Sequence, residues 1–464
     1  MRKLALPILA FLLVGCTVGP KYHRPAIDTP AAYRGETAAQ PSVGSAESLG
    51  NEKWWDVFQD PVLQQLIRTA LQQNYDARIA ATRVLQAQAE LGITRANQFP
   101  MLGAGAQAFS ERNPKISSAF PSYQTNVAQV DLSVIWNLDF WGKYRRETEA
   151  ARANLLASEW GQRAVLTSVV SSVASSYFQL RELDLALEIS KSTLASRKDS
   201  LRLTNVLQKN GSASMLDVRQ SEELVYTAAE TIPDLERQIA QQENALSILL
   251  GENPGGIPRG RALTEQPNPP TPPAGLPSEL LERRPDIREA EETLIAANAE
   301  IGVAKAAYFP DISLTGTAGF ESYALTKLFN ASSGLWNTAG TLTQPVFEAG
   351  SLHAGTRLAE AQEQQMLLTY KQTIQDAFQQ VSDSLVAYQK DREFREQQEL
   401  LTSAAQQADQ LSNTLYQHGG ASYLQVLTSE TDYFAAELNL AQAQLNERLS
   451  LVQLYNALGG GWQQ

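Results

Sequence analysis

The side chains that most often carry chemistry, cysteine and histidine, are few and far apart in this chain. The sequence has one cysteine, Cys16, and three histidines, His23, His353 and His418. A single cysteine cannot form a disulfide within the chain and excludes the usual cysteine-based zinc sites. A nucleophile needs a base and an orienting group close by, and the sequence brings no such set together. We therefore predict no enzyme, no catalytic residue and no metal site.

The charge balance argues against a nucleic-acid partner. The chain has 464 residues, with 38 Lys and Arg against 50 Asp and Glu, and its net charge is −12. A negatively charged protein repels the phosphate backbone, so we expect no nucleic acid among its partners.

The chemistry expected of Cys16 is lipidation. Arg2 and Lys3 precede an apolar run over residues 4–14, which is typical of a secretory signal and too short for a bilayer that needs roughly 20 residues. The run ends in LVGC, which resembles a bacterial lipobox. This predicts cleavage before Cys16, which then carries a diacylglycerol and an N-acyl chain as its only covalent group, with no other cofactor. The alternative is a buried cysteine beside a core helix.

The elements that follow are duplicated. Residues 76–100 match residues 286–310 at an offset of 210, and residues 203–222 match 411–430 at an offset of 208. We predict a signal peptide at 1–15, a lipidated N-terminal tether at 16–52, a first repeat at 53–254, a Pro-rich crossover at 255–277 and a second repeat at 278–464. Each repeat is expected to contain a helix, two strands and two long helices.

Heptad spacing identifies the first of the long helices, and the glycine turns and the repeat place the others. Apolar residues recur at every seventh position in the first of them: Leu166, Val173, Leu180, Leu187, Leu194 and Leu201. This pattern predicts a coiled-coil seam, and the turn at Gly211 predicts that the next helix returns antiparallel. The long helices are expected at 142–208, 215–250, 351–417 and 423–458, and the opening helix of the first repeat at about 61–98, before the FP break at 99–100.

Alternating segments between the helices predict strands. Apolar residues occupy every second position from Val130 to Phe140 and from Ile312 to Phe320. These two strands are expected at 126–140 and 311–322. Segments 101–111 and 335–347 alternate less cleanly, and we expect them as the hairpin partners of these strands. The four strands could form a soluble sheet packed on the helices, or a sheet in lipid. In lipid, open edges are costly, so one chain could not close the sheet, whereas three would form a 12-stranded barrel with a lumen.

Several motifs resemble the TolC-like outer-membrane factors, in the lipoprotein branch that serves drug-efflux pumps. These motifs are CTVGPKY at 16–22, WW at 54–55, WNLDFWG at 136–142, ERRPDI at 282–287, QPVFEAG at 344–350 and the two FP breaks at 99–100 and 309–310. The resemblance covers the chain from Cys16 to about Gly460. It implies an α+β membrane protein, a trimer whose 12-stranded β-barrel continues into an α-helical periplasmic tunnel, anchored in outer-membrane lipid.

The resemblance also implies roles for the two turns between long helices. They would dock a periplasmic adaptor through small residues: Gly211, Ser212, Ala213, Ser214, Gly419, Gly420, Ala421 and Ser422. Leu424 falls where relatives place an apolar ring at the closed end, although it could be an ordinary coiled-coil seam residue. Relatives often carry an acidic residue where this chain has Thr428. Asp217 could supply the carboxylate instead, or could simply complement the dipole of its helix.

An aromatic group lies at the end of the second strand. Trp136, Phe140 and Trp141 could form a belt at the membrane interface or a core cluster.

The function that we predict is passive export through the outer membrane. The chain would receive drugs or other small molecules from the adaptor and an RND-type inner-membrane pump. The alternatives are an exit duct for type I protein secretion and a periplasmic coiled-coil lipoprotein spacer without a channel. The strand hairpins and the duplication favour the channel, because a spacer needs neither.

Overall fold

The computed structural model describes residues 17–30, 32–34, 48–114, 122–267 and 277–462. The predicted signal peptide, Cys16 and residues 268–276 of the Pro-rich crossover lie outside these residues. The chain forms two compact units, which we call the sheet unit and the hairpin unit. The sheet unit comprises Met1–Ala26, Arg83–Ser158 and Glu289–Lys371, and the hairpin unit comprises Ile27–Thr82, Glu159–Arg288 and Gln372–Gln464.

The compact units do not coincide with the sequence repeats. Each repeat contributes residues to both units, because four helices (α4, Tyr75–Ala96; α5, Lys143–Lys209; α8, Pro285–Ala306; α9, Ser351–Gln417) have residues in both. The duplication therefore does not divide the chain into two consecutive domains.

The predicted opening helix at 61–98 is wrong in one respect, because the structure divides it. Helix α3 spans Pro61–Gln73 and α4 begins at Tyr75. Asn74 between them has an extended ψ of 132°, donates from Nδ2 to the Leu249 carbonyl at 2.8 Å and accepts from the Ala77 amide at 3.1 Å. An asparagine in this conformation ends one helix and caps the next. The second repeat breaks at the equivalent place, between α7 (Pro277–Arg283) and α8.

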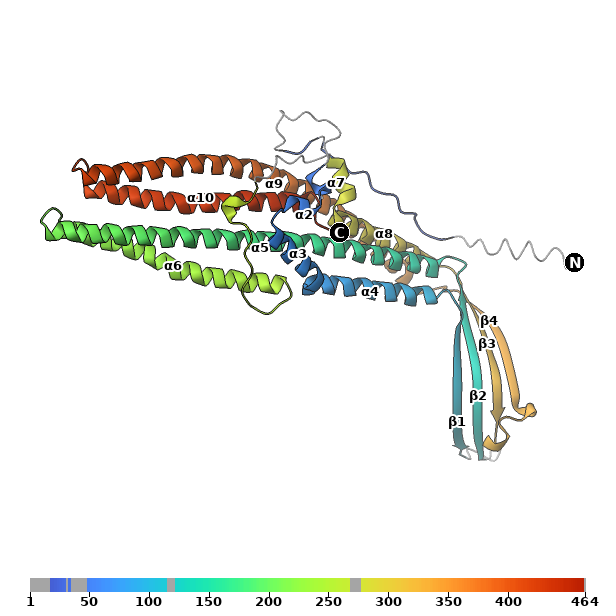
Figure 1. Ribbon diagram of the computed structural model, residues 1–464. Coiled ribbons are helices and arrows are strands. Elements are labelled where there is room, and N and C mark those ends of the chain that lie inside the picture. The colour runs from blue at the N-terminus through green and yellow to red at the C-terminus, as the bar shows by residue number, and fades with distance from the viewer. Residues whose placement is uncertain (1–16, 31, 35–47, 115–121, 268–276, 463–464) are drawn as a thin grey trace. The chain divides into compact units, whose positions relative to one another are not determined.

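The sheet unit contains all four strands, in the order β1-β2-β3-β4, and each neighbouring pair is antiparallel (Figure 1). They are β1 Met101–Asn113, β2 Tyr123–Leu138, β3 Asp311–Ser322 and β4 Gly334–Thr343. The second and fourth end before the predicted residues 140 and 347. Asp139 instead accepts from the Tyr144 and Arg145 amides at the start of α5, and Pro345 has no amide to extend β4. Short helices η3 (Leu325–Lys327) and η4 (Ala331–Ser333) connect β3 to β4.

The register gives the sheet two chemically different faces. Every pair in the three ladders joins residues of the same parity, as in Leu102↔Val134, Val134↔Gly316 and Gly316↔Thr338. Since side chains alternate along a strand, even-numbered residues share one face and odd-numbered residues share the other. Between the helix-proximal end of the sheet and the level of Ala128, the even face consists of Leu, Ala, Val, Trp, Ile, Gly and Phe, apart from Thr338 and, at the border, Ser322. The odd face carries mostly Gln, Asp, Glu, Ser, Asn and Thr; its large apolar side chains are Met101, Phe109, Val127, Ile135 and Leu335.

An N-terminal arm, residues 17–26, packs along the helices of the sheet unit. Arg146 is only 4% exposed and donates to three successive arm carbonyls, at 3.3 Å from Val18, 3.4 Å from Gly19 and 3.0 Å from Pro20. A Cβ on Gly19 would lie 2.5 Å from the Cα of Gly302. The first described residues of the tether predicted at 16–52 are therefore held against α5. The composition of the tether did not indicate this contact.

The hairpin unit is built on antiparallel helix pairs. Helix α6 spans Met215–Leu249 and lies beside α5, and α10 spans Tyr423–Ala457 and lies beside α9 (Figure 1). Each predicted seam residue from Leu166 to Leu201 is buried or half-buried. Each pair also contains one hydrogen bond between its two helices, at repeat-related positions. Thr204 bonds Ser221 at 3.3 Å in the first pair, and Ser412 bonds Ser429 at 2.5 Å in the second.

The remaining short helices belong to the hairpin unit: η1 Leu49–Asn51, α2 Trp54–Val57 and η2 Leu263–Glu265. Within the described part of the chain, no helix combines the length and apolar character needed to cross a bilayer.

Candidate functional site

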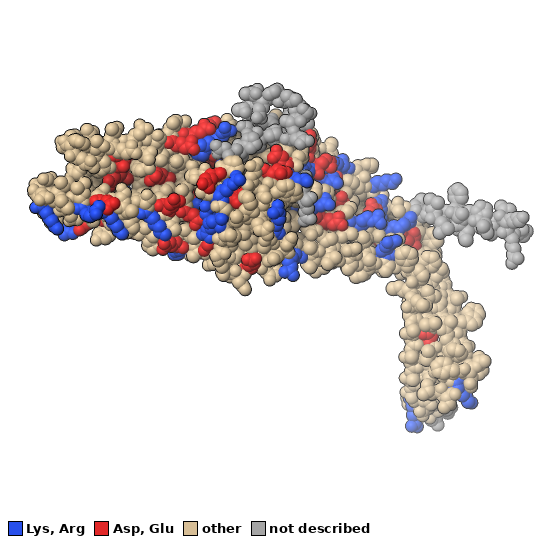
Figure 2. Space-filling model, in the orientation of Figure 1, with Lys and Arg blue, Asp and Glu red and all other residues tan. Residues whose placement is uncertain are grey.

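The apolar face of the sheet is exposed in the single chain. Leu102 is 74% exposed, Leu132 54% and Trp336 78%. Exposed apolar area of this extent needs a cover, either lipid or another protein surface. The space-filling view shows few charged side chains on the visible surface of the sheet (Figure 2).

The polar face carries one sign of charge. Glu111, Asp131, Asp311 and Glu321 are odd-numbered strand residues, and the described odd positions of the four strands include no Lys or Arg. Gln129 donates to Asp131 at 3.1 Å and accepts from Gln107 at 2.8 Å, which orders polar side chains across β1 and β2. A solvated face with fixed carboxylates attracts cations.

Both outer strands of the sheet have one hydrogen-bonded neighbour. β1 pairs with β2 alone and β4 pairs with β3 alone. Their other backbone edges are open, and an open edge is a template for pairing with another strand.

The structure separates the three aromatic residues at the end of β2. Trp136 lies on the apolar face, is 39% exposed and donates to the Gln98 carbonyl at 3.2 Å. Trp141 lies after the strand, where it donates to the Pro310 carbonyl at 2.8 Å and stacks on Phe309 at 4.7 Å. Phe140 is half-buried between them in sequence. Trp136 is thus accessible on the apolar face, whereas Trp141 is packed at the junction after β2.

The predicted docking residues form tight turns between the long helices. Gly211 and Gly419 have φ of +78° and +75°, and open space surrounds both, so their glycine identity follows from the left-handed backbone. The Ser212 amide donates to the Leu207 carbonyl at 2.9 Å, and the Gly420 amide to the Leu415 carbonyl at 2.8 Å. Ser212, Ser214, Gly420 and Ser422 are exposed, whereas Ala213 and Ala421 are half-buried.

The three predicted gate residues lie next to these turns, but in different settings. Leu424 is 62% exposed, so within this chain it is not a seam residue; the buried seam positions are Tyr423, Val426 and Leu427. Thr428 is exposed and its hydroxyl donates to the Leu424 carbonyl at 2.9 Å.

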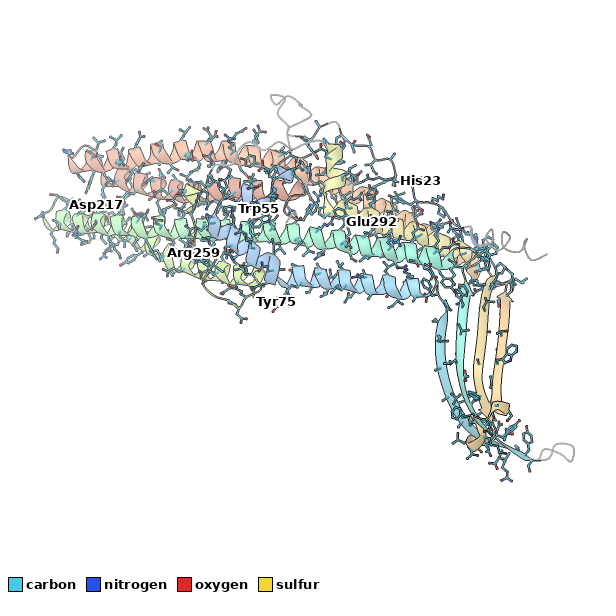
Figure 3. All side chains as sticks on the ribbon, turned by 45° about the vertical axis from the view of Figure 1, so that its right-hand side comes forward. His23, Trp55, Tyr75, Asp217, Arg259 and Glu292 are labelled. Atoms are coloured by element: carbon cyan, nitrogen blue, oxygen red, sulfur yellow. The ribbon has the colours of Figure 1, made fainter. Side chains whose placement is uncertain are left out.

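Asp217 caps its own helix. Its carboxylate accepts from the Ser214 amide at 2.7 Å, and the Ser214 hydroxyl accepts from the Asp217 amide at 3.1 Å, which makes a capping box at the start of α6. The residue lies at the turn end of that helix (Figure 3). The helix-terminal role considered for Asp217 is therefore realised, and only its free oxygen is available to a neighbouring group.

Buried polar contacts join the two helix pairs near the turns, and sequence patterns did not reveal them. Ser221 of α6 hydrogen-bonds Tyr423 of α10. Arg197 of α5 is 3% exposed and lies 4.9 Å from the centroid of the Phe434 ring. Burial raises the pKa of Glu430, and the nearby Asp409 adds to the rise. The positive charge of Arg197 opposes this rise without cancelling it. Such residues occupy single positions in long helices and have no local signature.

A duplicated chain with long helical hairpins and a sheet that is apolar on one face and polar on the other defines an α+β membrane-protein class. The model of the outer membrane efflux protein family matches residues 66–252 and 276–460, once in each predicted repeat. The chain therefore belongs to the outer membrane efflux protein family. This confirms the resemblance seen in the sequence, the duplicated α+β fold class and the outer membrane as the location.

Relatives match over nearly the whole chain. The chain is 37% identical to "Cation efflux system protein CusC" of Escherichia coli O6:H1, with 98% of each protein covered. It is 38% identical to "Solvent efflux pump outer membrane protein SrpC" of Pseudomonas putida, covering 100% of this chain and 99% of that protein. The open-state crystal structure of the Neisseria gonorrhoeae MtrE outer membrane channel superposes with a TM-score of 0.87 at 31% identity, over 97% of this chain and 99% of that one.

Proposed function

We propose that three copies of this chain form a passive export channel through the outer membrane. The observation that carries this proposal is the sheet: one apolar face, one polar face and two open edges. Pairing β1 of one copy with β4 of the next satisfies both edges and closes 12 strands, 3 × 4 by the strand order. The apolar face then meets lipid and the polar face lines the lumen.

The lumen that results favours cations. Each copy contributes Glu111, Asp131, Asp311 and Glu321 to the polar face. Three copies place rings of carboxylates along the path, and such rings raise the local concentration of cations and repel anions.

In this proposal, the two turns between the long helices dock the periplasmic adaptor, and the residues beside the turns close the periplasmic end of the channel. Gly211–Ser214 and Gly419–Ser422 present small residues, which allow a periplasmic adaptor to approach the backbone closely. The exposed Leu424 supplies an apolar ring that closes the path when three copies meet, with Thr428 one helical turn further along and Asp217 on the paired hairpin. Trp136 marks the periplasmic border of the lipid-facing band, and acyl chains on Cys16 add a second attachment to the membrane.

The cargo in this proposal consists of small molecules, delivered by the adaptor and an RND-type inner-membrane pump. The names of the relatives refer to cations and to solvents, which indicates that one channel architecture serves chemically different cargoes. Choice of cargo therefore falls to the pump, and the channel itself performs no reaction.

Planar-bilayer recording on the purified protein tests the channel. The proposal predicts discrete conductance steps and a reversal potential that shows preference for K⁺ over Cl⁻. The Asp131→Asn variant should weaken that preference, whereas Asn126→Asp, on the other face, should leave it unchanged. Protein that inserts into the bilayer yet never conducts would support a coiled-coil spacer instead.

A further inference from the structure

Charge is segregated by face at the end of the sheet that is remote from its junctions with α4 and α5. Glu111 and Arg112 are consecutive residues of β1, so they point to opposite faces. Glu111 lies on the polar face together with Glu321, and Arg112 lies on the even-numbered face, paired in register with Gln124. The apolar band of that face ends at Ala108, Ala128 and Ser322, so Arg112 stands just beyond it.

The connection between β3 and β4 folds over the same even-numbered side. Phe329 packs edge-on against Phe320, an even-numbered strand residue, with ring centroids 5.7 Å apart. Within this connection Leu328 is buried, whereas Tyr323, Leu325 and Phe329 are 78%, 72% and 73% exposed. Three large, exposed apolar side chains at the border of an apolar band are typical of contact with lipid at a membrane interface.

A second cation lies in this connection. Lys327 ends η3 between the exposed Leu325 and Phe329, and its side chain is exposed. Among the described residues, neither Lys327 nor Arg112 forms a salt bridge within the chain. Both are therefore available to an external anion.

Closure of the barrel brings Arg112 of one copy close to Lys327 of the next, at the strand junction between copies, which we call the inter-copy seam. This step depends on the proposed function. Arg112 lies at the far end of the β1 edge, and the connection that carries Lys327 leads into the β4 edge. When β1 of one copy pairs with β4 of the next, Arg112 comes to the same rim as the neighbour's Lys327 and its exposed aromatic side chains.

We propose that Arg112 and Lys327 bind the phosphate groups of a phosphorylated glycolipid in the outer leaflet of the membrane. Guanidinium and ammonium groups are the side chains that recognise phosphate, and Tyr323, Leu325 and Phe329 would contact the upper part of the acyl chains. This end of the sheet is opposite to its junctions with α4 and α5, which the proposed function places on the periplasmic side, so the leaflet in contact is the outer one. Three seams give three sites on each channel.

Native mass spectrometry of the purified protein with bisphosphorylated lipid A tests this site. The wild-type protein should bind up to three lipid A molecules, and the Arg112→Gln/Lys327→Gln double variant should bind at least tenfold more weakly. Lys198→Gln/Lys209→Gln is a matched control, because it removes the same charge from exposed positions on α5 and should bind as the wild type does. The charge-conserving Arg112→Lys/Lys327→Arg variant should restore most of the binding.

Competition identifies the source of the phosphate. Phosphatidylglycerol and inorganic phosphate at the same concentration should displace little lipid A; equal displacement by either would overturn a glycolipid site. Equal binding by the wild type and the double glutamine variant would overturn it as well. The same spectra report the number of chains, and bilayer recording of the same sample reports conductance. A conducting trimer without lipid A binding contradicts this inference alone, whereas a non-conducting monomer contradicts the proposed function.

Discussion

The Tyr177 hydroxyl donates a 2.9 Å hydrogen bond to Oδ2 of Asp60, and neither residue is exposed. Oδ1 of Asp60 caps α3 by accepting from the Val62 amide at 2.9 Å, while Gln266 donates to Oδ2 at 2.8 Å. Tyr177 in turn accepts from the Gly260 amide at 2.9 Å. A single buried carboxylate thus ties α3, α5 and the segment after α6 together in the hairpin unit.

Removing the Tyr177 hydroxyl should destabilise the hairpin unit. Tyr177→Phe leaves a buried charge with one donor fewer, and a hydrogen bond to a charged group contributes about 1.5–3 kcal/mol. Thermal unfolding in detergent should show a lower midpoint for this variant. Tyr308→Phe, at a partly exposed tyrosine of the sheet unit, serves as the control and should keep the wild-type midpoint. An unchanged midpoint for Tyr177→Phe would show that the buried bond contributes little.

Stability should also depend on the ionisation of Asp60. Burial alone would raise the pKa of Asp60, but hydrogen bonds from Gln266, Tyr177 and two backbone amides outweigh it and hold the pKa below its usual value. The stabilisation from Asp60 is therefore complete above the pKa of the unfolded carboxyl, about 4, and is lost as the pH falls through the lower folded pKa. Midpoints measured from pH 7 down to 3 should converge for the wild type and Asp60→Asn. A constant gap between them would contradict this assignment.

Adjacent residues of β2 should respond differently to the same substitution. Leu132→Arg places a charge on the lipid-facing side, where it costs about 2–4 kcal/mol near the middle of the bilayer. We expect little of this variant in the outer-membrane fraction. Ser133→Arg puts the same charge in the lumen, so it should assemble normally and reduce the preference for cations. Equal membrane yields for the two variants would contradict the assignment of faces.

Arg146 should hold the N-terminal arm in place. Its guanidinium group donates to three arm carbonyls, and Arg146→Met removes all three bonds. Limited trypsin digestion should then cut after the exposed Lys21 several-fold faster than in the wild type. Arg24 cannot report the same release, because Pro25 follows it.

The matched control for this experiment is Arg152→Met, because Arg152 is exposed and lies on the same helix, α5. It should be cut at Lys21 at the wild-type rate. If both variants are cut equally fast, the arm is held by packing rather than by Arg146.

Replacing Leu424 should open the periplasmic end. Leu424→Ser removes the apolar ring, and bilayer recording should show a several-fold higher mean conductance than for the wild type. Leu216 holds the repeat-related position on α6 and is 65% exposed, so Leu216→Ser is the matched control and should conduct as the wild type does. Equal effects of the two substitutions would place the constriction elsewhere.

The sequence predicted the helices and strands in which apolar residues recur at a regular spacing. Heptads, the glycine turns and the repeat located the long helices to within one residue at each end. Alternation located β2 and β3, because one face of each strand has a repeated side-chain environment. The weaker alternation in β1 and β4 follows from their composition, because three of the six even positions of β1 are alanine and β4 contains Thr338 and Gly340.

Features that depend on one side chain escaped prediction. The helix break at Asn74, the arm held by Arg146 and the packing of Arg197 on Phe434 each rest on contacts between residues distant in sequence. The sequence does not distinguish a buried arginine from an exposed one, because the difference arises only when the chain packs. Asp217 shows the reverse case, because its capping role follows from a local Ser-x-x-Asp pattern.

The number of copies in the detergent-solubilised particle tests the account most directly, because one chain supplies four strands with two open edges. Light scattering with simultaneous refractive-index and absorbance detection gives the protein mass without the detergent. Our account predicts three times the 50.8 kDa mass of the chain, before signal cleavage and lipidation. A particle with the mass of one chain, stable and unassociated, would contradict it.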